Sequence, residues 1–523
     1  MAKRNQKKSV SQPTQSERRK RLVWFSDPNA ALPWVFACLA LVTGAISFDS
    51  RLGLSGDNAE FMILGKSIAE GHGLSYVHTT DIKPATKFPF GFPVLLAGLH
   101  LVFPHSVLSM KLFVMFCFVA AIPLFYKYFL HQSNFTIAIL VSLISVACHF
   151  VLDYTHQVMS EIPYMLASVV ALSAIEATSR SRTNRSVVLA ILAAMAAYYI
   201  RSIGISIIVG GVAYFLLQKM YKEGGIFAAG CSLLALPWQI RTSILGGDSY
   251  VKTWLFRVNP YRPDGGEIGW FGLVERIIEN AQIYMMRELP VALFPHQDAA
   301  AYRRFSENIP IGIGILAGAL ITYFIVTQLL KRRLVGIYLL LYLGACFLWP
   351  IVWTDIRMLT PVLPLLFFGI IIGCRDLLGK ILDTKLTIVC LSLISLVLVI
   401  SNTYTIASKS YEESQYAPEW STYFEAARWI EKNTDEDTVV ACRKAFLMAI
   451  ISKRKTTSYA LTEDNRAVIR SLEEGLADVV VVDQLSFNST SRFLIPTIAN
   501  ANERFEFLHV IANPDTYILR FYR

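Results

Sequence analysis

The residues of this chain best suited to chemistry are acids and arginines placed at the ends of apolar segments. They are Asp57, Glu60, Glu161, Arg201, Arg241 and Arg357. Ionisable side chains cost free energy to hold at a membrane face, so their convergence on one side predicts a reaction site. A carboxylate there could accept a proton from a hydroxyl group, and guanidinium groups could bind a phosphate.

Structural explanations exist for the same residues. Asp57 as an N-cap with Glu60 three residues later is a capping-box pattern, and it would open an amphipathic helix over residues 56–71. Ser160 could cap the following helix while Glu161 complements its dipole. A single arginine at the end of a span is typical of an interfacial anchor, whereas three on one face could form a phosphate site.

The elements that must position these side chains are membrane spans. Hydrophobic residues make up 54% of the 523 positions and charged residues 17%, which predicts a polytopic α-helical membrane protein. The net charge of +10 lies in short clusters between apolar runs, as orientation signals do, so we expect acidic lipid and no nucleic acid as the partner of this charge. Tryptophans near span ends, such as Trp238, Trp349 and Trp353, predict an aromatic belt, with sugar stacking as the alternative.

Charge sets the predicted topology. The basic tail, residues 1–31, is expected in the cytoplasm. Residues 88–104 are short for a span and broken by Pro and Gly, and if they crossed, the basic loops at Arg180–Arg185 and Lys331–Arg333 would lie outside. We therefore predict a juxtamembrane segment there and about eleven spans. The spans are 32–48, 107–127, 135–152, 162–178, 186–200, 202–217, 225–240, 309–329, 334–353, 358–374 and 386–404.

Three outer segments complete the predicted organisation, with a transmembrane domain over residues 32–404. Two are loops, 49–106 and 241–308, and the third is a small soluble α/β domain over 405–523. Strand-like runs and helical stretches alternate in that domain, but it has no Gly-rich phosphate loop. The strands are expected at 438–441, 478–483, 505–511 and 517–521, and the helices near 420–432 and 463–475. No metal-ligand spacing and no disulfide framework are present.

Four motifs in this order resemble the GT-C class of integral-membrane glycosyltransferases, especially the protein O-mannosyltransferases and lipid A aminoarabinose transferases. They are GDNAEF after the first span, KFPFGFP, SEIP, and DIRMLTPVLPLL before a Pro-rich span. The resemblance implies that Asp57 is the catalytic base, Glu161 the acid of the second outer loop, and Lys87 the phosphate-binding cation. Many members carry a second acid where this chain has Asn58. No cofactor is expected, and a divalent metal is left open.

The expected activity is sugar transfer from a polyprenyl-phosphate-linked donor to an acceptor hydroxyl at the outer face. A single displacement would invert the anomeric carbon, with Asp57 as base and with Glu60, Lys87, Arg201, Arg241 and Arg357 binding substrate. The acceptor could be a lipid, a glycan or a protein, and loop 241–308 and the C-terminal domain would select it. The alternatives are a carrier or flippase for such lipids and a polysaccharide polymerase or ligase. We expect a bacterial inner membrane, although an endoplasmic-reticulum protein would satisfy the same topology.

Overall fold

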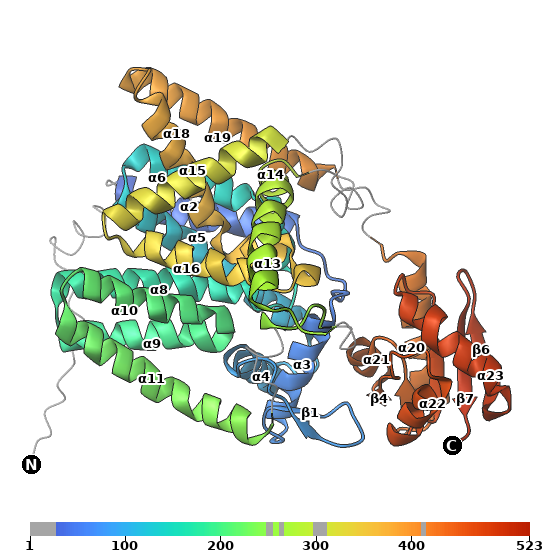
Figure 1. The fold of residues 1–523 in the computed structure, drawn as a ribbon. Helices are drawn as coiled ribbons and strands as arrows, with labels where there is room; N and C mark the ends of the chain where they lie inside the picture. The colour runs from blue at the N-terminus through green and yellow to red at the C-terminus, as the bar shows by residue number, and fades with distance from the viewer. Residues whose placement is uncertain (1–27, 247–254, 261–265, 296–310, 409–414) are drawn as a thin grey trace, which may run out of the picture.

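A computed structural model of the chain describes residues 28–246, 255–260, 266–295, 311–408 and 415–523. Most of the predicted cytoplasmic tail, residues 1–27, lies outside this set. The fold consists of a large body of long helices, against one end of which the C-terminal α/β region packs (Figure 1).

Each of the eleven predicted spans overlaps a helix of the structure. Several helices begin at a side-chain cap, as where Asn134 accepts a hydrogen bond from the Ile137 amide and Asp383 accepts one from the Leu386 amide. The helices are α2 (Pro28–Ile46), α5 (Val107–Gln132), α6 (Phe135–Ala147), α7 (His149–Thr155), α8 (Glu161–Ser181), α9 (Asn184–Ile200), α10 (Ile205–Leu217), α11 (Tyr221–Ile244), α15 (Ile311–Leu330), α16 (Leu334–Phe347), α17 (Ile356–Leu359), α18 (Leu363–Leu378) and α19 (Thr384–Ala407).

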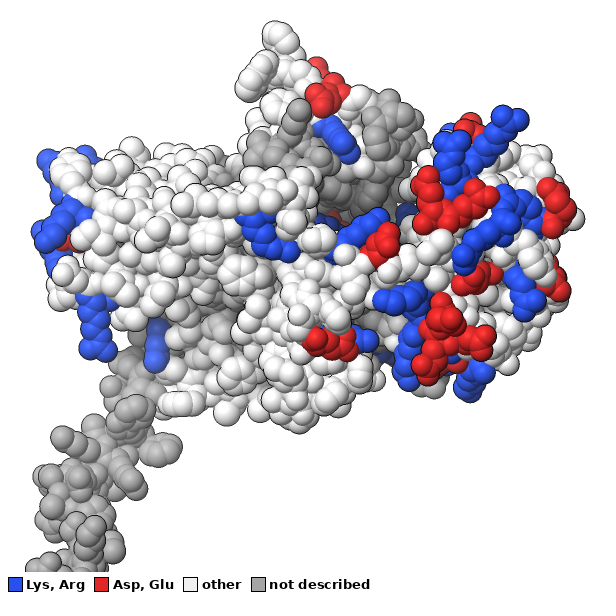
Figure 2. Space-filling model, turned by 90° about the horizontal axis from the view of Figure 1, so that it is seen from below, with Lys and Arg blue, Asp and Glu red and all other residues white. Residues whose placement is uncertain are grey.

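Among the described residues, five helices are long and apolar enough to cross a membrane, or six if α6 and α7, bent by 55° at Cys148, form one span. Large apolar side chains remain exposed on the outer faces of α2, α9, α11 and α19. In the view of Figure 2, most of the visible surface of the helical body is uncharged. α4 (Gly91–Val102) is about 18 Å long, too short to cross a hydrocarbon core of about 30 Å.

The loops that carry the predicted inner charges gather at one end of the body. The side-chain amide of Gln218 donates to the Arg332 carbonyl over 2.9 Å, and Arg333 Nη1 donates to the Gln132 carbonyl over 3.3 Å. Arg180 contacts His131 at the same end. These contacts join the loops after α5, α8, α10 and α15. The cytoplasmic assignment of this end stays a prediction.

Helix α3 (Gly56–Ala69) differs from the amphipathic helix that the sequence predicted. Its N-cap is Ser55 and not Asp57, and Ser55 makes no side-chain capping bond, so the predicted capping box is wrong. Both carboxylates instead contact cations from other segments. The helix is buried around most of its circumference because its outer side is covered as well: Ala59 belongs to a hydrophobic cluster with Trp420 of the C-terminal domain.

The C-terminal domain is a five-stranded mixed sheet in the order β4-β3-β5-β7-β6. β3 (Val439–Ala441), β5 (Val479–Val482), β6 (Phe505–Ile511) and β7 (Thr516–Phe521) lie where strands were predicted. The short edge strand β4 (Lys455–Thr457) was missed, since three residues carry no apolar alternation. The helices of this domain are α20 (Pro418–Asn433), α21 (Ala445–Ser452), α22 (Asn465–Glu474) and α23 (Ile495–Asn500). β3 pairs in parallel with β4 and β5, whereas β7 is antiparallel to β5 and β6.

Candidate functional site

Six of the seven predicted site residues form one continuous series of ion pairs, which we call the ion-pair chain. In spatial order it contains Glu60, Lys87, Asp57, Arg357, Glu161 and Arg201. Acids and cations alternate along it. The ion-pair chain links five segments of the protein: α3, the segment before α4, the start of α8, the break after α9, and α17.

The first half of the ion-pair chain surrounds Asp57. Lys87 Nζ lies 3.1 Å from Asp57 Oδ1 and 2.7 Å from Glu60 Oε2, so it joins two carboxylates that are one helical turn apart on α3. Glu60 Oε1 also accepts a hydrogen bond of 2.7 Å from the Tyr76 hydroxyl. The other oxygen of Asp57, Oδ2, lies 2.9 Å from Arg357 Nη1. Each oxygen of Asp57 therefore has its own cation.

The second half is centred on Glu161, whose side chain is fully buried. Its Oε1 accepts from Arg201 Nη1 over 2.6 Å and from Arg357 Nε. Its Oε2 has no hydrogen-bond partner among the described residues. Arg201 Nη1 also donates to the Ser160 hydroxyl over 3.1 Å. The expected side-chain cap from Ser160 to α8 is wrong, because this hydroxyl makes no capping bond and instead orients a guanidinium. A buried carboxylate between two arginines holds three distant segments together.

The pKa of Asp57 reflects a competition between burial and charge. Burial acts to raise it, but Lys87 and Arg357 outweigh that effect and lower the pKa to about 2. For Glu60, burial prevails over the Lys87 charge and the Tyr76 hydrogen bond, and the pKa stays above its ordinary value. Asp57 is thus an ionised carboxylate at neutral pH that its cations hold in a weakly basic state.

A cavity of about 1280 Å³ adjoins the ion-pair chain. Asp57, Lys87, Arg201 and Arg357 line it, and its walls are rich in aromatic side chains. Those are Phe88, Phe150, Tyr198, Trp238, Trp349, Trp353 and Phe487. The three tryptophans named above line this cavity, as the sugar-stacking alternative requires, and the aromatic belt stays a prediction. Such a cavity can enclose a ligand of several hundred Å³ and stack rings against its apolar faces.

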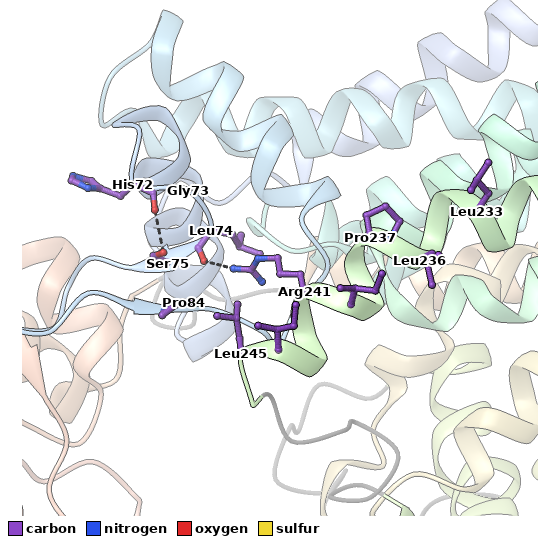
Figure 3. Close-up of a pocket in the computed structure, with 12 residues that line it drawn as sticks. His72, Gly73, Leu74, Ser75, Pro84, Leu233, Leu236, Pro237, Arg241 and Leu245 are labelled. Carbon is purple, nitrogen blue, oxygen red and sulfur yellow. Dashed lines mark hydrogen bonds between the residues drawn. The ribbon is translucent and has the colours of Figure 1, made fainter.

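Arg241 is the predicted residue that the structure keeps out of the ion-pair chain. It lies inside the last turn of α11 and not beyond the end of a span. Its Nη1 donates to the Ala85 carbonyl over 2.8 Å and its Nη2 to the Leu74 carbonyl over 3.0 Å. Figure 3 shows this guanidinium reaching from α11 to the loop of residues 72–75, in a separate pocket of about 830 Å³. Arg241 positions the first outer segment.

Asn58, the position where the resemblance would place a second acid, is not among the residues that line the cavity. Its side chain is buried against Gly53, where an added Cβ would lie 2.7 Å from Asn58 Nδ2. Within the described part of the chain, no group of three or more His, Cys, Asp or Glu side chains is placed to hold a metal ion.

Other cavity residues were not predicted. Arg287 and Glu288 pair over 2.5 Å in a π-helical turn, and Arg287 Nη2 donates to the Thr354 carbonyl over 3.1 Å. The sequence signal that could have identified this pair is two adjacent opposite charges directly before the apolar run LPVALFP. No sequence signal pointed to Phe487. It belongs to a polar stretch of the C-terminal domain and reaches the cavity only because that domain packs against the helical body.

Comparisons with solved structures show what this fold is similar to. ArnT from Cupriavidus metallidurans bound to undecaprenyl phosphate superposes with a TM-score of 0.58 at 12% identity, covering 94% of this chain and 98% of that one. Its apo state gives a TM-score of 0.57 at 11% identity. The Archaeoglobus fulgidus oligosaccharyltransferase, tethered by a disulfide to an acceptor peptide containing the NVT sequon, gives 0.56 at 11% identity, covering 96% of this chain and 75% of that one.

No protein-family model and no curated protein matches the sequence. At such low identities the structural likeness shows the fold. The chain has the fold of the GT-C glycosyltransferases, and the resemblance predicted from its four motifs is confirmed at that level.

Proposed function

We propose that this protein transfers a sugar from a polyprenyl-phosphate-linked donor to the hydroxyl group of an acceptor, in the cavity beside the ion-pair chain. The observation that carries the proposal is Asp57, an ionised carboxylate on the cavity wall whose two oxygens are each held by a cation. The fold supports it, because one of the similar structures has undecaprenyl phosphate bound.

In the proposed reaction, the acceptor oxygen attacks the anomeric carbon while the bond from that carbon to the phosphate oxygen breaks. The phosphate leaves with the bonding electron pair, and the acceptor proton goes to Asp57. Polyprenyl phosphate is a good leaving group, so no general acid is needed. The requirements are a base for the hydroxyl and cations for the phosphate. A single displacement of this kind inverts the configuration at the anomeric carbon.

The ion-pair chain explains how a carboxylate with a pKa of about 2 becomes a useful base. When the donor phosphate enters, it competes with Asp57 for Lys87 and Arg357, because guanidinium and ammonium groups bind phosphate strongly. Each cation that moves to the phosphate releases one oxygen of Asp57 and raises its pKa. Donor binding thus activates the base, and without donor the site stays neutralised.

Glu161 keeps Arg201 and Arg357 at the cavity in this mechanism. Glu161 is fully buried and is not among the residues that line the cavity, so any orienting effect on the substrate passes through these two arginines. We place the site on the extracytoplasmic face of a bacterial inner membrane, with the acceptor a lipid, a glycan or a protein.

A carrier for the same lipids would need charges along a path through the spans. Lys111 and Glu176, the main ionisable residues inside spans, are hydrogen-bonded to neighbouring segments instead. Lys111 Nζ donates to the Asp49 and Arg51 carbonyls, and Glu176 accepts from Tyr128 and Gln132. Neither lines the cavity, which favours transfer over transport.

The test uses purified protein in lipid, a panel of polyprenyl-phosphate monosaccharides, and a membrane extract as acceptor. Free polyprenyl phosphate is quantified for the wild type, for Asp57→Asn and for Asp81→Asn, an exposed acid of the same outer segment. We expect Asp57→Asn to reduce release by about 10²- to 10⁴-fold and Asp81→Asn to leave it unchanged. Equal rates for wild type and Asp57→Asn would end the base assignment. Labelled lipid that crosses the bilayer without any release would favour the carrier.

A further inference from the structure

The C-terminal domain forms part of the cavity wall and is held firmly against the helical body. Lys455 Nζ donates to the Val77 carbonyl and the Thr456 amide donates to the His78 carbonyl, each over 2.7 Å. The aromatic side chain of Phe487 lines the same cavity as Asp57. The surroundings of Phe487 are therefore within reach of a substrate in the site.

Two cations of the C-terminal domain surround Phe487. Lys444 Nζ lies 4.3 Å from the centroid of the Phe487 ring, and the Arg443 guanidinium carbon lies 5.1 Å from it. Arg443 Nε also donates to the Ser489 hydroxyl over 2.6 Å, which fixes its direction. Both side chains are half-buried. Among the residues that the structure describes, no carboxylate oxygen lies within 4.0 Å of either cation.

Nearby acids act on Lys444 electrostatically, although they form no ion pair with it. Burial lowers the pKa of Lys444, and so does the Arg443 charge, while Asp57 and Asp483 act to raise it. Asp483 is buried and accepts hydrogen bonds from Thr490 and from the Leu485 amide. Lys444 is thus within electrostatic range of Asp57, and holding two half-buried like charges together costs free energy unless an anion offsets it.

The charge of the ion-pair chain shows where an additional cation is needed. It contains three carboxylates and three cations, so its formal charge is zero. A polyprenyl-phosphate sugar brings one negative charge into the cavity, and the released phosphate approaches two near neutral pH. An electroneutral site supplies hydrogen-bond donors but no net attraction for this anion. Arg443 and Lys444 would add two positive charges behind Phe487, the residue of the C-terminal domain that lines the cavity.

We propose that Arg443 and Lys444 bind an anionic group of a substrate beside Phe487, which makes the C-terminal domain part of the substrate site. The proposal rests on the proposed function for the identity of the reaction. The anion has two possible sources, the phosphate of the donor or an acidic group of the acceptor. In both cases the C-terminal domain selects a charged substrate over an uncharged one.

The test combines binding and kinetics on Arg443→Gln, Lys444→Gln and the double variant of the full-length protein. The matched control is Lys432→Gln, which removes an exposed cation from α20 of the same domain. The binding probes are a short polyprenyl phosphate and the polyprenol of the same length, titrated in detergent. If the donor is the source, each single variant should lose roughly tenfold or more of the wild-type preference for phosphate over alcohol, and Lys432→Gln none.

A retained preference for phosphate, together with a KM for the acceptor raised roughly tenfold or more, would assign the anion to the acceptor. The proposal is overturned if neither quantity changes, or if Lys432→Gln changes them equally. The outcome is separable from that of the proposed function. Release of polyprenyl phosphate that depends on Asp57 but not on Arg443 or Lys444 would leave the transferase standing and remove this inference. If no release occurs with any donor, the proposed function fails. The binding preference for polyprenyl phosphate over polyprenol in the Arg443 and Lys444 variants then decides this inference by itself.

Discussion

Arg357 Nη1 lies 2.9 Å from Oδ2 of Asp57. An arginine of α17, late in the sequence of the helical body, therefore neutralises the acid that follows the first span. The same guanidinium donates through Nε to Glu161. Arg357 is therefore shared between the proposed base and a buried acid. Any phosphate that draws Arg357 away changes the charge balance at both.

The acid limb of the pH–rate profile should depend on Lys87. The pKa of Asp57 is held at about 2, so the wild type should show no loss of activity from this group above about pH 4. Lys87→Gln removes a cation that favours the ionised form, which raises the pKa and moves the limb upward by about one to three pH units. We would measure kcat/KM, which reports the enzyme without bound donor, from pH 3 to 8. Lys83→Gln, an exposed lysine of the same segment, should not move it, and an unmoved limb in Lys87→Gln would contradict the assignment.

Glu161→Gln should destabilise the protein strongly. It leaves Arg201 and part of Arg357 without their buried counter-charge, at a cost of about 3–5 kcal/mol. The measurement is the apparent melting temperature in detergent. Glu70→Gln is the control, because Glu70 pairs with Lys66 over 3.7 Å at an exposed site, where such pairs contribute about 0–1 kcal/mol. Equal shifts for the two variants would show that Glu161 is not a structural centre of the site.

Gly91→Ala should reduce activity by displacing α4, the helix that follows Lys87. A Cβ at Gly91 would lie 2.6 Å from the backbone carbonyl carbon of Tyr199, and backbone cannot yield as a flexible side chain does. We expect a cost of about 1–3 kcal/mol and a lower kcat/KM. Gly98→Ala, on the same helix with nothing within 4 Å, should be neutral or slightly stabilising. The idea fails if the two variants have the same activity.

Arg241→Gln should act on the first outer segment and not on the chemistry. Losing two charge-assisted hydrogen bonds to the carbonyls of Leu74 and Ala85 should loosen the loop around them, which limited proteolysis at residues 72–85 would detect. The loss of kcat should be at least about tenfold smaller than in Arg357→Gln, which removes a cation from Asp57 itself. A comparable loss in both variants would return Arg241 to the substrate site.

Local patterns determined much of this protein. Long apolar runs made the helices predictable, because apolar periodicity and length are properties of a segment by itself. The same holds for four strands of the C-terminal domain. Placing the ionisable residues at span ends also follows from local chemistry, since charges are excluded from the apolar stretches between them. These rules identified five of the six residues that meet in the ion-pair chain, and the resemblance of the KFPFGFP motif added Lys87.

Tertiary structure decided which of these residues act together. Lys87 reaches Glu60 across 27 positions and Arg357 reaches Glu161 across 196, and no local pattern encodes such pairings. Arg241 looked equivalent to Arg201 in sequence, but two backbone carbonyls of the first outer segment bind its guanidinium. Phe487 joined the site because the C-terminal domain docks beside α3. Side-chain partners depend on how segments pack. The members of the ion-pair chain were therefore readable from the sequence, whereas their partners and the contribution of Phe487 came only from the fold.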